Sequence, residues 1–243
     1  ATVLRAGPDA AVVVDTGPDP GPVDRCLAQL GITQVPWLVL THLHADHAGG
    51  VAGVAKGRRV ERLLYSGVET PAGNWRQVLA ALPDVPRLTG TPGTVVAAGA
   101  VQLSVLSRRP LLSPGTDDRD SAEENDSSLV LRAQFPGLRV VLAGDVEPAG
   151  QEAALAGAPD LNAQVLLVPH HGSARQSSGF LEAVGASVAL ISVGADNDYG
   201  HPATRTLATV SATGARVFRT DRNGAIAISS GPDGLLITTQ RSP

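Results

Sequence analysis

The chain has 243 residues, of which 43% are apolar and 17% charged, enough for the hydrophobic core of one or two globular domains. No apolar run approaches the roughly 18 residues that cross a bilayer, and the first residues lack a leader pattern, so we expect neither a membrane span nor a signal peptide here. A net charge of −4 argues against simple electrostatic wrapping of nucleic acid, and the single cysteine excludes an internal disulfide and a multi-cysteine metal site.

Strand and helix signals alternate through the first third of the chain. Short apolar runs at 11–15 and 36–40 stop at turn-forming or polar residues and predict buried strands. Helical spacing of apolar residues at 23–30 ends at a glycine, which is typical of a helix terminus. The segments 60–65 and 74–82 repeat this succession of a strand and a helix.

Successive strands follow from about residue 94, and strands and helices then alternate again. The predicted strands lie at 94–98, 101–106, 129–135, 138–143, 164–168, 188–192, 215–219, 225–229 and 235–239, and the predicted helices at 178–184 and 202–213. Two mixed series of this kind predict an α/β (α+β) domain over residues 1–243, in which two sheets pack face to face with helices outside. The segment 107–127 is expected to be a long irregular loop, either functional or a solvated excursion.

A cluster of histidines directly follows the predicted strand at 36–40. His42 and His44 are two residues apart, so in extended backbone they point to the same side. Asp46 and His47 follow after a turn, at a plausible helix start near Asp46, and can face the same cavity. Four potential metal ligands within six residues are hard to reach by chance, since the chain has only six histidines.

Two later strand ends offer further ligands. The apolar run at 140–143 is followed by Gly144 and Asp145, and the run at 166–168 is followed by Pro169, His170 and His171. Polar residues directly after buried strands are where α/β proteins place their active sites. We therefore expect Asp145 and the histidine pair to join the first cluster.

The motif His-x-His-x-Asp-His, with a later strand-end Gly-Asp and a further histidine, resembles the metallo-β-lactamase superfamily. The resemblance implies an αβ/βα sandwich with two divalent ions, Zn²⁺ or Mn²⁺, at one edge. It assigns His42 and His44 to the first ion, Asp46 and His47 to the second, Asp145 to a bridge between them, and His170 or His171 to completing the site. Asp15, at the end of the predicted first strand, would orient a ligand imidazole.

The sequence departs in one respect from the pattern of most hydrolases in this superfamily, and this departure indicates which branch it resembles. No histidine lies between His47 and His170, where other branches usually place a ligand of the first metal. Residues 125–131, 169–173 and 197–202 together are similar to the C-terminal domain of the ComEC family of DNA-internalisation competence proteins. This similarity implies a fragment of a longer membrane protein, lacking the family's first strand. It also implies an extracytoplasmic location, a channel and other DNA-uptake proteins as partners, and DNA as the substrate.

His201 and three small polar residues complete the candidate site. Because Pro202 fits the first turn of a helix, His201 is expected at a helix entrance. It could bind metal, protonate the leaving oxygen, contact a phosphate or simply cap the helix. Asn125, Ser128 and Ser173 could contact a phosphate or a ligand through their amide and hydroxyl groups.

We expect metal-dependent hydrolysis of phosphodiesters, in which the non-imported strand of incoming DNA is degraded. Two ions would clamp the phosphate and acidify a water, while Asp46 orients the nucleophile and His201 protonates the leaving oxygen. Two alternatives stay open. One is a hydrolase of small esters, thioesters or lactams that uses the same site, and the other is a DNA-guiding module that has lost catalysis.

Overall fold

Two large sheets form the centre of the protein in a computed structural model, which describes residues 1–111 and 122–242. The first sheet has five strands in the order β1-β2-β4-β6-β7. Its strands are β1 (Thr2–Arg5), β2 (Ala11–Val14), β4 (Leu38–Leu40), β6 (Leu63–Tyr65) and β7 (Arg87–Thr89). Strand β1 is antiparallel to β2, whereas β2, β4, β6 and β7 run parallel, so the carboxyl ends of four strands lie at one edge.

The second sheet has seven strands in the order β14-β13-β12-β11-β10-β9-β8. Its strands are β8 (Val95–Ala98), β9 (Val101–Ser107), β10 (Val130–Phe135), β11 (Leu138–Leu142), β12 (Val165–Leu167), β13 (Val188–Ile191) and β14 (Arg216–Arg219). Strands β8 to β11 form an antiparallel meander, and β11 to β14 are parallel.

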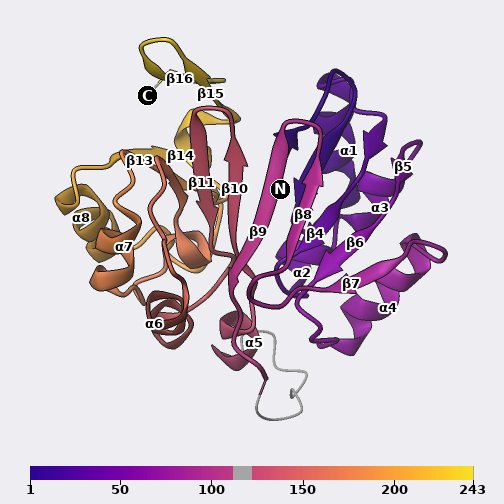
Figure 1. Ribbon diagram of the computed structural model, residues 1–243, viewed down its shortest axis with the longest axis horizontal. Helices are drawn as coiled ribbons and strands as arrows, with labels where there is room; N and C mark the ends of the chain where they lie inside the picture. The colour runs from indigo at the N-terminus through magenta and orange to yellow at the C-terminus, as the bar shows by residue number, and fades with distance from the viewer. Residues whose placement is uncertain (112–121, 243) are drawn as a thin grey trace.

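Helices cover the outer faces of both sheets (Figure 1). The first half of the chain supplies α1 (Pro20–Gln29), α2 (Ala45–Ala48), α3 (Val51–Ala55) and α4 (Ala72–Ala81). The second half supplies α5 (Ala122–Asp126), α6 (Pro148–Gly157), the 3-10 helix η1 (Pro169–Gly172), α7 (Ser178–Val184), α8 (Thr204–Ala212) and α9 (Thr220–Asn223). Two small ladders complete the fold: β3 (Gln34–Val35) with β5 (Arg59–Val60), and the hairpin of β15 (Ile226–Gly231) and β16 (Gly234–Thr239).

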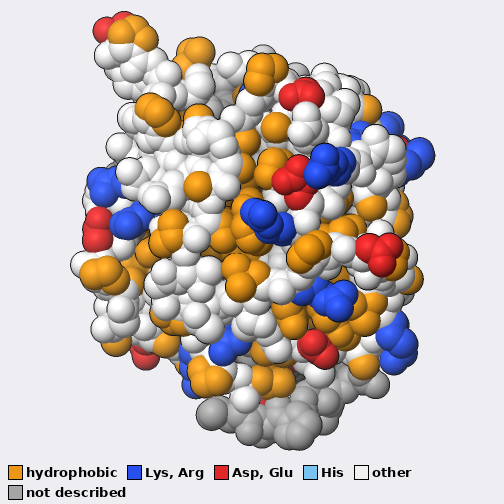
Figure 2. Space-filling view, turned by 45° about the vertical axis from the view of Figure 1, so that its right-hand side comes forward, with side chains coloured by type: hydrophobic (Ala, Val, Ile, Leu, Met, Phe, Trp, Pro, Cys, Tyr) orange, Lys and Arg blue, Asp and Glu red, His pale blue; other side chains and the backbone are white. Residues whose placement is uncertain are grey.

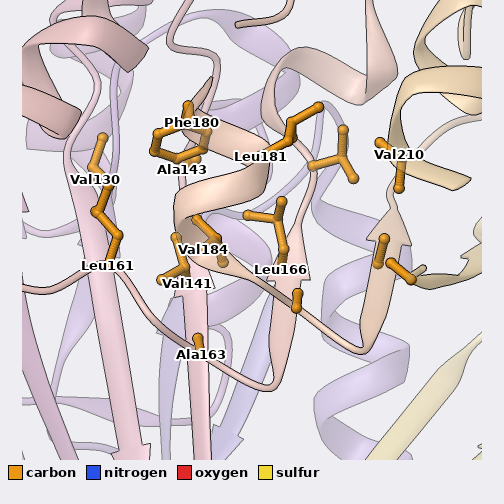
Figure 3. Packing of buried hydrophobic residues seen from close by; sticks show 14 of the residues in the cluster. Val130, Val141, Ala143, Leu161, Ala163, Leu166, Phe180, Leu181, Val184 and Val210 are labelled. Atoms are coloured by element: carbon orange, nitrogen blue, oxygen red, sulfur yellow. The ribbon is translucent and has the colours of Figure 1, made fainter. Parts of the chain in front are cut away.

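The core has three layers, because side chains along a strand alternate between the two faces of its sheet. In β2, Val12 and Val14 face the second sheet, while Ala11 and Val13 face the helices. The outer layer of the second sheet is shown in Figure 3, where α7 places Phe180 and its neighbours over β11 and β12. This arrangement confirms the predicted αβ/βα sandwich.

Several local predictions were wrong. The segment 107–127 contains α5, which begins at Ala122 and carries buried polar residues, while residues 112–121 lie outside the described part. Pro202 does not start a helix: the Ala203 N–H donates to the carbonyl of Gly172, so the chain is still docked there and α8 begins at Thr204. The sequence patterns also missed β1, β7, α3 and α6.

Candidate metal centre

The candidate ligands gather at the edge where the parallel strands of both sheets end. Asp15 follows β2, and Thr41 to His47 follow β4 and enter α2. From the second sheet, Asp145 follows β11, and the histidine pair follows β12. The Leu129 N–H, just before β10, donates to the Thr41 carbonyl at 3.0 Å and ties the two sheets together at this edge.

Four side chains converge into one potential metal site: Asp46, His47, Asp145 and His171 each offer a ligand atom, and these atoms all lie within 4.8 Å of one another. His47 Nε2 is 3.1 Å from Asp145 Oδ1, and His171 Nε2 is 3.0 Å from Asp46 Oδ2. The two Nε2 atoms lie 3.3 Å apart. Two imidazole nitrogens and two carboxylates without a thiolate form a donor set that suits Zn²⁺ and Mn²⁺.

The opposite nitrogen of each imidazole already has a partner, which aims Nε2 at the cluster. His171 Nδ1 donates to the Ser192 carbonyl at 2.7 Å. His47 Nδ1 lies 2.8 Å from Asp15 Oδ2. Ligand histidines in metalloproteins are commonly held in this way, by a carboxylate or carbonyl on the far nitrogen. The four residues therefore fit a divalent ion.

The protonation equilibria of the cluster reflect its concentrated charge. Burial lowers the pKa values of His47 and His171, but the charge of Asp145 and its hydrogen bonds outweigh this effect. The pKa of His171 is raised to about 10, and that of His47 is raised well above its ordinary value. Burial would raise the pKa of Asp145, yet the two imidazoles hold it well below its usual range. An Asp145 that stays ionised is a suitable ligand for a cation.

His42 and His44 form a second pair of donors beside the cluster. His42 Nε2 lies 3.1 Å from His44 Nδ1, and the His42 ring is 4.2 Å from the His47 ring, centroid to centroid. Burial lowers the pKa of His42 well below its ordinary value, which keeps this imidazole in the neutral form that binds metals. These are the two residues that the sequence resemblance assigns to the first ion.

The structure distinguishes the two neighbouring histidines that the sequence could not. Both adopt left-handed backbone, with φ of 50° at His170 and 52° at His171, so their side chains diverge. His171 enters the cluster, whereas His170 Nε2 is 4.0 Å from Asp145 Oδ2 and its Nδ1 is 3.5 Å from Glu147 Oε1. His170 therefore lies beside the four-residue site and not within it.

Asp15 contacts the site in the manner expected of a residue that orients a ligand. Besides His47 Nδ1, its carboxylate accepts the Thr41 N–H at 2.8 Å and the Thr41 hydroxyl. Its φ of 54° is a left-handed conformation that non-glycine residues rarely adopt, and such residues concentrate at functional sites.

His201 lies farther out than the four-residue site. Its ring packs edge-on against the His170 ring at 5.6 Å and stacks with the ring of Tyr199, which is 73% exposed. Asn197 holds this loop, since its amide bonds both the N–H and the carbonyl of His201. His201 thus contacts the surroundings of the site through His170 and is partly exposed.

The three small polar candidates are all buried. Ser128 Oγ accepts the Asp145 N–H at 3.2 Å, so this hydroxyl supports the backbone of a candidate ligand. Ser173 Oγ accepts the Arg175 N–H at 3.4 Å. Asn125 Oδ1 is buried without a hydrogen-bond partner among the described residues.

Two buried carboxylates of the site were missed by the sequence analysis. Glu124 Oε2 lies 2.8 Å from His44 Nε2, and Glu147 lies between His170 and Arg175, whose Nη1 is 2.9 Å from Glu147 Oε2. Glu124 belongs to an acidic segment and Glu147 follows a strand end, and neither segment has a motif of its own. Nothing in the sequence around Glu124 indicates that its partner is His44, 80 residues away.

The fold and site can be compared with known proteins. The family model described as "Metallo-beta-lactamase superfamily" matches residues 1–194. The chain is 34% identical over 202 residues to ComE operon protein 3 of Bacillus subtilis (strain 168), which covers 82% of this chain and 25% of that relative. It is 36% identical over 120 residues to competence protein ComA of Neisseria gonorrhoeae, covering 49% of this chain and 17% of ComA. The chain therefore spans about a quarter or less of these curated relatives.

Among solved structures, Zn²⁺-bound PqqB from Methylobacterium extorquens is similar in fold. The TM-score is 0.56 at 13% identity, and the match covers 89% of this chain and 84% of PqqB. At that identity the likeness concerns the fold alone.

Proposed function

The chain belongs to the metallo-β-lactamase superfamily, and from this premise we propose that it is a metal-dependent phosphodiesterase that degrades one strand of DNA during uptake. The observation that carries the hydrolytic part is the convergence of Asp46, His47, Asp145 and His171 at the joint edge of two sheets. The similarity to two competence proteins supports DNA as the substrate.

We assign the metal-holding residues as follows. The four-residue cluster would hold one ion, and His42 with His44 would offer donors to a second, with Asp145 of the cluster as the residue proposed to serve both. A divalent ion, when bound, supplies a Lewis acid for the phosphoryl oxygen and lowers the pKa of a water. The nitrogen and oxygen donors suit Zn²⁺ or Mn²⁺.

The chain's own residues would orient and protonate the reactants. The Asp46 side chain is 49% exposed and is the most accessible carboxylate of the cluster, so it is placed to accept a hydrogen bond from an attacking water. The His201 ring packs against the His170 ring and is our candidate for protonating the leaving oxygen, because an imidazole beside the cluster can donate a proton to substrate.

The face shown in Figure 2 has its Lys and Arg side chains dispersed among acidic and uncharged ones. Electrostatic wrapping of DNA generally needs a concentrated basic surface. We infer that bound metal ions would neutralise the scissile phosphate.

We further propose that the domain works as part of a longer membrane protein that carries a DNA channel, on its extracytoplasmic side, with other DNA-uptake proteins as partners. The support is the match to a quarter or less of two competence proteins. None of the helices in residues 1–111 and 122–242 is long and apolar enough to cross a bilayer. That residues 1–243 form one domain stays a prediction.

A matrix of metals and substrates tests the proposal. The chain is stripped of metal, reloaded with Zn²⁺ or Mn²⁺, and offered single-stranded DNA, a chromogenic phosphodiester, a chromogenic lactam and a thioester. We expect turnover of DNA and the phosphodiester that disappears in Asp145→Ala. Turnover of only the lactam or thioester would favour the small-molecule alternative. Retained metal with no turnover of any substrate would favour the DNA-guiding module.

A further inference from the structure

A buried carboxylate lies directly behind one of the candidate metal ligands. Glu124 Oε2 is 2.8 Å from His44 Nε2, and the two side chains are only 1% and 7% exposed. The contact joins α5 to the loop that follows β4, across 80 residues of sequence. In Figure 1, α5 lies below the two sheets.

The chemistry of this contact fixes which nitrogen of His44 carries the hydrogen. A carboxylate oxygen accepts hydrogen bonds, so this contact assigns an N–H to His44 Nε2. His44 Nδ1 then carries a lone pair and no hydrogen, and this atom lies 3.1 Å from His42 Nε2. The histidines of the four-residue cluster use the reverse arrangement, in which Nδ1 is bonded and Nε2 faces the site.

We propose that Glu124 is a positioning residue that holds His44 in the Nε2–H tautomer and makes Nδ1 a metal-binding atom beside His42. Glu124 thereby sets the affinity of the ion at this histidine pair, although it does not bind the ion itself. The inference rests on the proposed metal centre but not on its substrate.

The surroundings keep Glu124 in place. The Ser127 hydroxyl donates to the Glu124 carbonyl at 2.7 Å and closes the end of α5. Two residues on, Asp126 accepts the backbone N–H groups of Glu147 and Gly150 and pairs with Arg109 at 2.8 Å. The helix is thus pinned to α6 on one side, while Glu124 bonds to His44 on the other.

The first test measures the tautomer without metal or substrate. Long-range ¹H–¹⁵N correlation spectra of the metal-free chain separate Nδ1–H from Nε2–H imidazoles. We expect His44 of the wild type, and of Glu124→Gln, whose amide oxygen still accepts, to be Nε2–H. In Glu124→Ala we expect a mixture of tautomers. An Nδ1–H His44 in the wild type, or a Glu124→Ala spectrum identical to it, would overturn the proposal.

The second test measures Zn²⁺ binding by competition with a chromogenic chelator. Loss of a residue that orients a ligand typically weakens metal binding about 10–100-fold. We expect Glu124→Ala to weaken the binding of one ion by this factor and Glu124→Gln to retain most of the wild-type affinity. Glu123→Ala, which changes an exposed neighbour on α5, should bind as the wild type.

Unchanged binding in Glu124→Ala overturns the proposal. Weak binding with an unchanged tautomer overturns it too. Neither readout depends on nuclease activity, so failure of the proposed function would be seen separately.

Discussion

Asp145 is the side chain that the histidines from both sheets share. Its Oδ1 is 3.1 Å from His47 Nε2 and its Oδ2 is 3.4 Å from His171 Nε2. We expect Asp145→Ala to lose metal and activity together, because the two imidazoles lose the charge between them. Asp15→Ala removes only the support of His47 and should cost about 10–100-fold in metal affinity. Elemental analysis and metal titration measure both effects, and equally small losses would contradict the assignment.

The neighbouring histidines of η1 should differ sharply on substitution. His171 lies in the four-residue cluster, whereas His170 Nε2 is 4.0 Å from the nearest Asp145 oxygen. We therefore expect His171→Ala to lose one ion per chain and His170→Ala to keep the wild-type stoichiometry after reloading. Each variant is the matched control of the other, because the substitution and the backbone conformation are the same. Loss of the ion from His170→Ala alone would reverse our assignment.

His201 should act on the substrate and not on the metal. Its ring contacts His170 and Tyr199 and is placed outside the four-residue cluster. We expect His201→Ala to keep its metal but to lose about 10²–10⁴-fold in rate on DNA, the usual contribution of general acid catalysis. The loss should shrink for a p-nitrophenyl phosphodiester, whose leaving group needs no proton. Loss of an ion would instead make His201 a ligand.

At the scale of the elements, α5 joins the site to α6. Asp126 is buried, and its Oδ1 accepts the N–H groups of Glu147 and Gly150 at 2.8 and 2.9 Å, at the start of α6. The close contact between Asp126 and the backbone of α6 requires glycine at position 150, since a Cβ there would lie 2.6 Å from Asp126 Oδ1.

We expect Asp126→Ala to lower the free energy of unfolding by about 1–3 kcal/mol, because buried N–H groups would lose their acceptor. Urea unfolding followed by circular dichroism measures this change. Asp160→Ala is the control, since its pairs with Arg132 and Arg139 are partly exposed and worth about 0–1 kcal/mol. Equal losses in the two variants would show that the buried acceptor has no special role.

The elements that the sequence predicts are those with a strong local signal. The apolar runs before His42, Asp145 and His170 end in polar residues, and each proves to be a strand that ends at the site. The pattern fails where the signal is weak or the partner is distant. Helix α6 is rich in Ala and Gly and has little apolar periodicity.

Distant partners explain what else the sequence could not predict. The role of Glu124 depends on His44, 80 residues away, and nothing in its own segment sets it apart from the other carboxylates. The choice between His170 and His171 depends on two successive left-handed residues that turn adjacent side chains in different directions. Neither feature has a period or a spacing that a single sequence could reveal.

At the scale of the whole molecule, the site is divided between the two sheets. Asp46 and His47 come from the first sheet, and Asp145 and His171 from the second, so a bound ion would link the halves of the sandwich. Because unfolding separates these ligands, only the native state would bind the ion tightly.

Metal should therefore raise the thermal stability of the entire chain. At a free ion concentration about 100 times the dissociation constant, the stabilisation is about 2.7 kcal/mol, equivalent to roughly 5–10 °C in Tm for a chain of this size. Differential scanning calorimetry of metal-free and reloaded protein measures the shift. We expect the full shift in the wild type and in Asp160→Ala, whose carboxylate lies outside the site, and a smaller shift in His171→Ala, which would lose one ion per chain. A wild-type Tm that does not change on addition of Zn²⁺ or Mn²⁺ would show that the two sheets do not share an ion.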